Sequence, residues 1–173
     1  MPLSLCRFVI LCAARTGSTW LRLMLQEHPD ILCHGEVLAP LADQIDGFEP
    51  VPELQLGLTG PQLADWRDAD PVGFLYEAVL PSGVADAVGA KLNYNQLENE
   101  LKCVRRKLVS DPELRIIHLK RRNLLARYIS GWVVQHTQVH GQGSQQGKSG
   151  RILFQEFLFF FGADLIPYQP EAL

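Results

Sequence analysis

The turn at residues 15–19, Arg-Thr-Gly-Ser-Thr, has the residue types of an anion-binding loop. It follows a continuous apolar run at 8–14 and precedes the segment 20–28, which ends before a proline. This order predicts a buried strand, a tight turn and a short helix. Backbone amides at a helix N-terminus bind anions with help from the helix dipole, and the Arg15 guanidinium adds a planar cationic donor. The sequence therefore predicts a phosphate or sulfate site at this turn.

This turn departs from the loop that holds nucleoside triphosphates, whose pattern is G-x-x-x-x-G-K-[ST]. Cys12 stands at the position of the first glycine of that pattern, and Ser18 stands at the position of its lysine. An ordinary nucleoside-triphosphate loop is therefore disfavoured. A strand-to-helix turn can also carry Gly and Ser for conformational reasons alone, so the motif by itself leaves both interpretations open.

The charges of the chain are unevenly distributed along the sequence. Residues 27–86 contain twelve acidic side chains and one basic side chain, whereas residues 102–127 contain nine basic and two acidic ones. A segment with this excess of Lys and Arg is suited to meet an anion. The formal net charge of the whole chain is −3, which disfavours a protein that coats nucleic acid.

Length and composition indicate one globular domain over residues 1–173. Apolar residues make up 47% of the chain and charged residues 20%, which excludes a disordered, collagen-like or solenoid protein. The four cysteines form no C-x-x-C pair, a pattern typical of reduced thiols in the cytoplasm. Because no apolar run reaches the ~20 residues of a membrane span, we expect a soluble, cytoplasmic protein.

Further apolar runs alternate between strand and helix character, which predicts an α/β fold. Parallel strands joined by right-handed crossovers form a central sheet with helices on both faces, and ligands collect at the carboxyl ends of its strands. The region at 40–73 is rich in Pro, Gly and Asp and is expected to be an irregular insertion with a weak helix near 62–68. The additional predicted elements are strands at 88–94 and 115–119 and helices over 97–108 and 124–133.

The end of the chain gives weaker signals. Residues 140–150, HGQGSQQGKSG, have the composition of a flexible loop. The segment 152–162, ILFQEFLFFFG, fits a buried helix or strand, and its phenylalanines would also suit a membrane surface. The sequence leaves these alternatives open.

Two motifs together resemble the family of sulfotransferases that use 3′-phosphoadenosine 5′-phosphosulfate (PAPS). The segment RFVILCAARTGSTWL resembles the family's 5′-phosphosulfate loop, and Arg122 with Ser130 matches its second motif, an Arg at a strand end followed eight residues later by a Ser. The segments HGEVL and GAKLNYNQL extend the resemblance to bacterial sulfotransferases of the nodulation-factor and trehalose-glycolipid type. The resemblance covers about residues 6–135, whereas 136–173 diverge from the pattern of relatives that are usually longer, which leaves a fragment, a shortened lineage and an inactive remnant as alternatives. It also implies a three-layer α/β/α fold of the P-loop nucleotide-hydrolase-like sulfotransferase type.

The resemblance implies a role for each matching residue on the donor. Arg15 neutralises the bridging oxygen and the 5′-phosphosulfate. Arg122 and Ser130 bind the 3′-phosphate, so Arg122 must lie in the turn before the helix that carries Ser130. Trp20 stacks on the adenine, although a place in the core is the alternative for this tryptophan. The residues that hold the phosphosulfate through amides and hydroxyls are Thr16, Gly17, Ser18 and Thr19.

The acceptor side of the predicted reaction needs a general base for a hydroxyl. By its position in the family pattern this base is Glu36, with His34 as the competitor, and Lys91 contacts the transferring sulfonate or the acceptor. His28 and His118 are expected to be structural. No metal is required for this transfer.

The resemblance implies carbohydrate sulfation, in which a sulfuryl group moves from PAPS to a hydroxyl of a carbohydrate or glycolipid. The expected partners are therefore small molecules, with no nucleic acid, while a peripheral membrane contact and a homodimer stay open. Two alternatives remain. One is a P-loop nucleotide kinase or NTPase, which would need Mg²⁺. The other is a non-catalytic module that binds an anion or RNA through residues 102–127.

Overall fold

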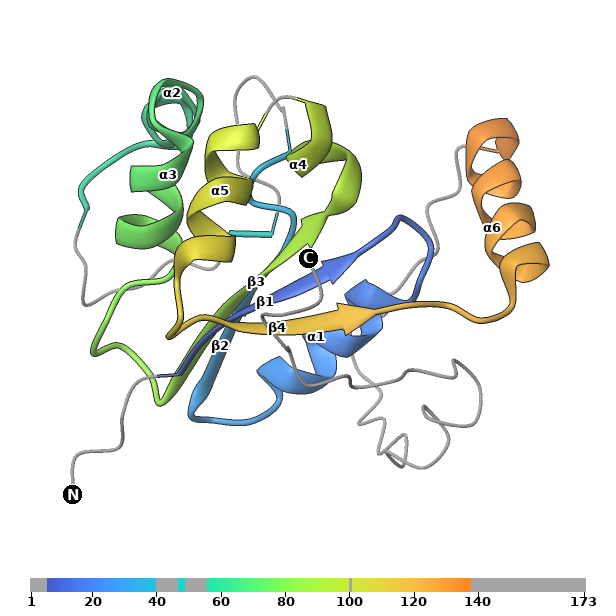
Figure 1. Cartoon of the computed structure of the whole chain (residues 1–173), viewed down its shortest axis with the longest axis horizontal. Coiled ribbons are helices and arrows are strands. Elements are labelled where there is room, and N and C mark those ends of the chain that lie inside the picture. Colours follow the sequence, from blue (N-terminus) through green and yellow to red (C-terminus); the bar gives the residue numbers. More distant parts are fainter. Residues whose placement is uncertain (1–5, 40–46, 49–55, 100, 138–173) are drawn as a thin grey trace.

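The fold is built on a parallel four-stranded sheet, and the first strand of the chain is one of its two inner strands. The structure is a computed structural model that describes residues 6–39, 47–48, 56–99 and 101–137. The strand order is β2-β3-β1-β4, and all pairs are parallel (Figure 1). The strands are β1 (Cys6–Cys12), β2 (Ile31–His34), β3 (Ala87–Asn93) and β4 (Arg115–Leu119). The helices are α1 (Ser18–Gln26), α2 (Gly60–Ala69), α3 (Pro71–Gly73), the π-helix η2 (Phe74–Val79), α4 (Tyr94–Asn99), α5 (Lys102–Ser110) and α6 (Leu124–Thr137).

Both faces of the sheet are covered by apolar side chains. Because side chains alternate along a strand, Val9 of β1 joins a core with η2, α5 and their neighbours, while Ile10 joins a second core with Leu21 of α1. Figure 1 shows α1 on one side of the sheet and α2 to α5 on the other. The predicted α/β class, with a parallel sheet between helices, is confirmed.

The connections predict a ligand site at the carboxyl ends of β1 and β3. These two strands are neighbours, yet α1 follows β1 on one face and α4 and α5 follow β3 on the other face (Figure 1). Connections that leave adjacent strands toward opposite faces open a crevice at the strand ends, where ligands bind in open α/β sheets. The turn at residues 15–19 follows β1 at this crevice.

Several elements differ from the sequence prediction. The short strand β2 was not predicted, and the helical run expected at 97–108 is divided between α4 and α5. The insertion expected to be irregular contains α2, which begins with a capping box between Thr59 and Gln62 and a proline in its first turn. These signals fix a helix start, and the weak helix predicted near 62–68 is confirmed as α2. Residues 40–46 and 49–55, like the predicted loop 140–150 and the segment 152–162, lie outside the described residues.

Helix α6 carries its predicted apolar stripe, but the large side chains of the stripe are exposed in the described part of the chain. Figure 1 shows α6 beyond the end of β4, away from the helices that cover the sheet. The less exposed side of α6 consists of small or polar residues together with one valine, and it faces the turn after β1: Ala126, Arg127, Ser130, Gly131 and Val134. The exposed large side chains are Leu124, Leu125, Tyr128, Ile129, Trp132 and Val133. Among the described residues, no helix is both long and apolar enough to cross a membrane.

The pairing of β1 with β3 depends on Gly89, which lies opposite Phe8 in the sheet. A Cβ atom at Gly89 would lie 2.3 Å from a ring carbon of Phe8, whose side chain is buried. We expect Gly89→Ala to lower the free energy of unfolding by about 1–3 kcal/mol, because the ring must leave its packed position. Thermal and urea unfolding measure this change. Phe8→Leu combined with Gly89→Ala should recover part of the loss, and strictly additive losses would contradict the clash.

Candidate functional site

The turn after β1 has a left-handed backbone at two of its residues, directly before α1. Gly17 is the N-cap of α1, with φ 91° and ψ 11°, and Arg15 also has a positive φ of 65°. The Thr16 hydroxyl is buried and donates to the Ala13 carbonyl oxygen at 2.8 Å. The Ser18 side chain is also buried, whereas Thr19 is exposed. The Thr16 hydroxyl therefore stabilises the turn itself.

The backbone of Arg15 is strained. A left-handed conformation costs a residue with a Cβ atom roughly 1–2 kcal/mol, and glycine, the residue that adopts it freely, stands two positions later. Such strain persists where the surroundings over-determine it, and it concentrates at functional sites. At Arg15 the surroundings include a hydrogen bond from Arg121 Nη1 to the Arg15 carbonyl oxygen at 3.2 Å.

The two sequence motifs that are far apart in the chain meet in the structure. Arg15 Nε donates to Ser130 Oγ at 3.0 Å, although 115 positions separate the two residues. Helix α6 begins at Leu124, and Asn123 caps it by accepting from the Ala126 amide at 2.8 Å. Arg122 therefore lies in the turn before the helix, as predicted, and is exposed to solvent.

Two further arginines reach the same turn, and sequence reasoning missed both. Arg127 Nε donates to the Ala14 carbonyl oxygen at 3.2 Å, and Arg121 donates to Arg15 as described. Neutral carbonyl oxygens accept these two bonds, and both guanidinium groups lie beside the turn. The sequence feature that could have indicated these arginines is the run of basic residues directly after β4. Because β4 pairs with β1 in parallel, this run lies beside the carboxyl end of β1.

A pocket of about 470 Å³ lies between the turn and α6. Its cationic side chains are Arg15 and Arg127, and its aromatic side chains are Tyr128 and Trp132. Planar cations suit phosphate and sulfate oxygens, and aromatic faces suit flat or apolar groups. The pocket therefore fits an anionic ligand with a bulky organic part. Its remaining lining residues are Ala14, Leu124, Gly131 and Gln135.

A polar cluster on the β3 side of the turn contains both residues predicted for the acceptor side. Lys91 Nζ lies 2.5 Å from Glu36 Oε1 and 3.3 Å from Thr19 Oγ1, so this lysine connects the carboxylate to the turn. Asn93 Nδ2 donates to Glu36 Oε2 at 2.6 Å. Lys91 and Asn93 are buried, whereas the Glu36 side chain is 29% exposed. The predicted base is thus accessible beside the turn at residues 15–19, and Asn93 is a neighbour that the sequence did not indicate.

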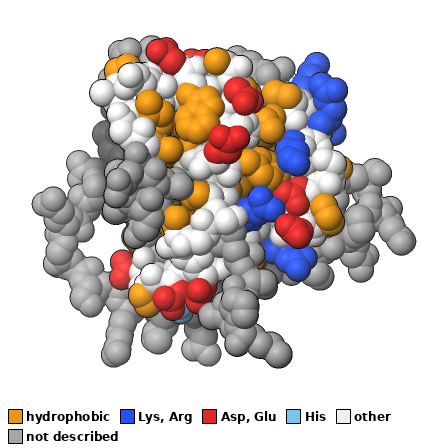
Figure 2. Space-filling view, turned by 90° about the vertical axis from the view of Figure 1, so that its left-hand side faces the viewer, with side chains coloured by type: hydrophobic (Ala, Val, Ile, Leu, Met, Phe, Trp, Pro, Cys, Tyr) orange, Lys and Arg blue, Asp and Glu red, His pale blue; other side chains and the backbone are white. Residues whose placement is uncertain are grey.

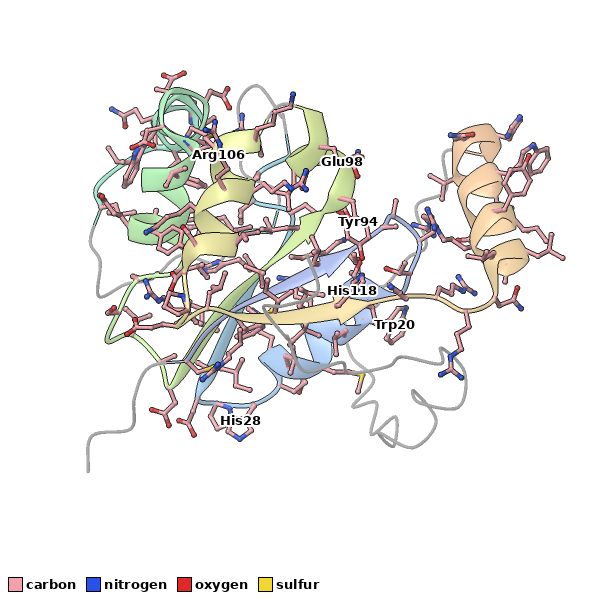
Figure 3. The ribbon with its side chains drawn as sticks, in the orientation of Figure 1. Trp20, His28, Tyr94, Glu98, Arg106 and His118 are labelled. Carbon is pink, nitrogen blue, oxygen red and sulfur yellow. The ribbon has the colours of Figure 1, made fainter. Side chains whose placement is uncertain are left out.

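Three histidines, His28, His34 and His118, lie in different environments. His34 is fully buried and stacks on Phe48 with ring centroids 5.2 Å apart, so it is not placed to meet a substrate hydroxyl. His28 is exposed beyond α1. His118 Nε2 and the Tyr94 hydroxyl share a hydrogen bond, and Figure 3 shows the two side chains together. Burial, followed by the nearby Lys120, lowers the pKa of His118 below its ordinary value.

Trp20 projects from α1, where 46% of its surface is exposed. Figure 3 shows it beside the sheet, at the end that carries the site. The alternative of a core tryptophan is therefore wrong. A stacking role on a ligand stays a prediction, since Trp20 does not line the pocket between the turn and α6.

The basic run at 102–127 does not form one continuous surface. Its first part lies on α5, which covers one face of the sheet, while Arg121 and Arg127 lie at the turn after β1. Figure 2 shows acidic, basic and apolar side chains near one another on the face that lies at the left of Figure 1. Within the described ranges, no group of three His, Cys, Asp or Glu side chains is arranged to hold a metal ion.

Comparison with known proteins assigns no family to the chain: neither a protein-family model nor a curated protein matches it.

Proposed function

We propose that this protein is a PAPS-dependent sulfotransferase that sulfates a hydroxyl group of a carbohydrate or glycolipid. The observation that carries the proposal is the hydrogen bond from Arg15 to Ser130, 3.0 Å long, because it joins the two motifs expected at the two ends of the donor. The parallel sheet with helices on both faces is compatible with the P-loop-like sulfotransferase fold that we infer. Free thiols at all four cysteines agree with a cytoplasmic location.

The donor is held at its two negatively charged ends. The amides at the start of α1 and the Arg15 guanidinium bind the 5′-phosphosulfate, because both can donate hydrogen bonds to its anionic oxygens. Arg122 and Ser130 bind the 3′-phosphate, the group that distinguishes this donor from ordinary nucleotides. Arg121 and Arg127 add positive charge around the turn.

The transfer step uses Glu36 as the general base. The acceptor hydroxyl oxygen attacks the sulfur atom, and the bond between sulfur and the bridging oxygen breaks. The hydroxyl proton passes to the Glu36 carboxylate, while the bridging oxygen leaves with the electron pair as part of adenosine 3′,5′-bisphosphate. Arg15 and Lys91 stabilise the negative charge that develops on the leaving group and the sulfonate. Lys91 is suited to this because it already lies beside Thr19 of the turn.

Ligand-dependent thermal unfolding tests the proposed donor. Adenosine 3′,5′-bisphosphate at about 100 times its dissociation constant should stabilise the native state by about 2.7 kcal/mol and raise Tm by about 5–10 °C. ATP with Mg²⁺ and a single-stranded RNA, tested in parallel, should give smaller shifts. A larger shift with ATP and Mg²⁺ would favour a nucleotide kinase or NTPase, and a larger shift with RNA would favour the binding module.

A matched pair of variants locates the 3′-phosphate site. Arg122→Ala should remove most of the shift caused by the bisphosphate, whereas Arg106→Ala, an exposed arginine on α5, should leave it unchanged. Incubation with radiolabelled PAPS and an extract of host lipids and glycans then tests transfer directly. Equal stabilisation of the Arg122→Ala and parental proteins by the bisphosphate would contradict the proposed donor geometry.

A further inference from the structure

Asn93 is a buried polar residue at the carboxyl end of β3, directly beside the proposed base. Only 7% of its surface is exposed. Its Nδ2 group donates to Glu36 Oε2 at 2.6 Å. The Asn93 amide group therefore donates to the Glu36 carboxylate and is shielded from solvent.

The orientation of this amide is fixed from its other end. Cys12 Sγ lies 3.4 Å from Asn93 Oδ1, and the two residues are partners in the pairing of β1 with β3. Burial raises the pKa of the Cys12 thiol, so the thiol keeps its proton at neutral pH. The thiol has two acceptors within reach, the Leu92 carbonyl oxygen at 3.7 Å and Asn93 Oδ1, of which Oδ1 is the nearer; donation to Oδ1 directs the NH₂ group toward Glu36.

The backbone of Asn93 is also held. Its amide donates to Gln96 Oε1 at 3.0 Å, at the point where β3 passes into α4. The strand pairs along its length with β1, and Cys12 is its register partner at this end. The sheet and the start of α4 therefore hold both the position and the side-chain orientation of Asn93. A residue that orients another group must itself be held in this way.

Glu36 itself lies on the segment that follows β2, and its carboxylate is held at both oxygens. Lys91 contacts Oε1, and Asn93 donates to Oε2. A carboxylate has about four lone-pair sites, so these two contacts leave capacity for a substrate proton. Because Lys91 also reaches Thr19, an anion bound at the turn competes for its ammonium group. Asn93 is neutral and anchored to the strand, so it keeps its contact when Lys91 turns to the anion.

From these contacts we infer that Asn93, held by Cys12, is a positioning residue that orients the Glu36 carboxylate toward the acceptor hydroxyl. The catalytic part of this inference rests on the proposed function. Asn93→Asp keeps the shape of the side chain but replaces the donor with an acceptor. We expect it to lower kcat by about 10- to 100-fold, since a misplaced catalytic group costs rate on that scale, while the KM for PAPS and the affinity for the bisphosphate stay at parental values.

The matched control is Asn95→Asp, the same substitution two positions along on the exposed side of α4; it should keep parental kcat. Cys12→Ser retains a donor for Asn93 Oδ1 and should lose less activity than Cys12→Ala. An Asn93→Asp enzyme that transfers sulfate as fast as the Asn95→Asp enzyme would overturn the inference.

A second measurement does not depend on activity. In protein labelled with ¹⁵N-asparagine, the Asn93 side-chain amide signal, assigned by its loss in Asn93→Asp, should move upfield and exchange faster with solvent in Glu36→Ala. The Asn95 signal should stay in place. An Asn93 signal that does not change in Glu36→Ala would overturn the inference, whatever the activity. If the parental protein transfers no sulfate, the proposed function fails, and this signal alone decides whether Asn93 holds Glu36.

Discussion

Glu36→Gln is expected to lower the rate of sulfate transfer by about 10²–10⁴-fold, the range attributed to a positioned general base. The amide has nearly the shape of the carboxylate and can still meet Lys91, but it cannot accept the hydroxyl proton. Binding of adenosine 3′,5′-bisphosphate should be unchanged, because Glu36 lies on the β3 side of the turn, in contact with Lys91 and Asn93. Steady-state kinetics with labelled PAPS and calorimetry with the bisphosphate measure the two effects.

Glu98→Gln provides the matched control for this substitution. Glu98 is exposed on α4 (Figure 3), so its variant should transfer sulfate at the parental rate. Parental transfer by Glu36→Gln itself would show that another group accepts the proton. His34 does not provide an easy replacement, since it is fully buried and stacked on Phe48.

Arg15→Ala should lower transfer by about 10²–10³-fold, the scale for removing one donor that stabilises developing negative charge. The variant loses the cation at the bridging oxygen and the hydrogen bond to Ser130. Alanine also carries a Cβ atom, so the cost of the positive φ at this position stays nearly the same. The loss is therefore expected in transfer kinetics and donor affinity, with little change in Tm.

Arg15→Lys separates charge from geometry. Lysine keeps the positive charge but lacks the planar guanidinium that meets Ser130 and two oxygens at once, so an intermediate rate is expected. Arg106→Ala, on the exposed side of α5, should have no effect. Full activity of Arg15→Ala would show that the Arg15 side chain takes no part in sulfate transfer.

The parts of the fold that sequence periodicity predicted are those with strong local signals. β4 was predicted at its observed bounds because an apolar run is enclosed by charged residues on both sides. The strand β2 was missed because four residues are too few to show a period. Helix α2 was predicted near 62–68, whereas α3 and η2 were missed because a region rich in Pro, Gly and Asp resembles a loop.

The candidate site was predictable where a residue type and its spacing carry the chemistry. Arg15, Gly17, Arg122 and Ser130 are of this kind, and the structure brings Arg15 and Ser130 into direct contact. Asn93, Arg121 and Arg127 were not predicted. Their roles depend on which strand ends lie side by side, and this information is carried by the β2-β3-β1-β4 order rather than by any local pattern.

The sequence predicted the apolar stripe of α6 but not its exposure to solvent. Periodicity shows that apolar residues share one side of a helix, whereas burial depends on what lies opposite. In α6 the small and polar side is the one that faces the turn, through Ser130 and Arg127.

The central place of β1 also affects how the chain is made. Phe8 pairs with Gly89 and Arg115, which follow it by 81 and 107 positions. At a synthesis rate of roughly 5–20 residues per second, the first partner of β1 emerges from the ribosome about 4–16 s after β1 itself. During this interval an apolar strand has two open edges, a state prone to aggregation. A nascent chain of this protein is therefore expected to depend on a chaperone until β3 is complete.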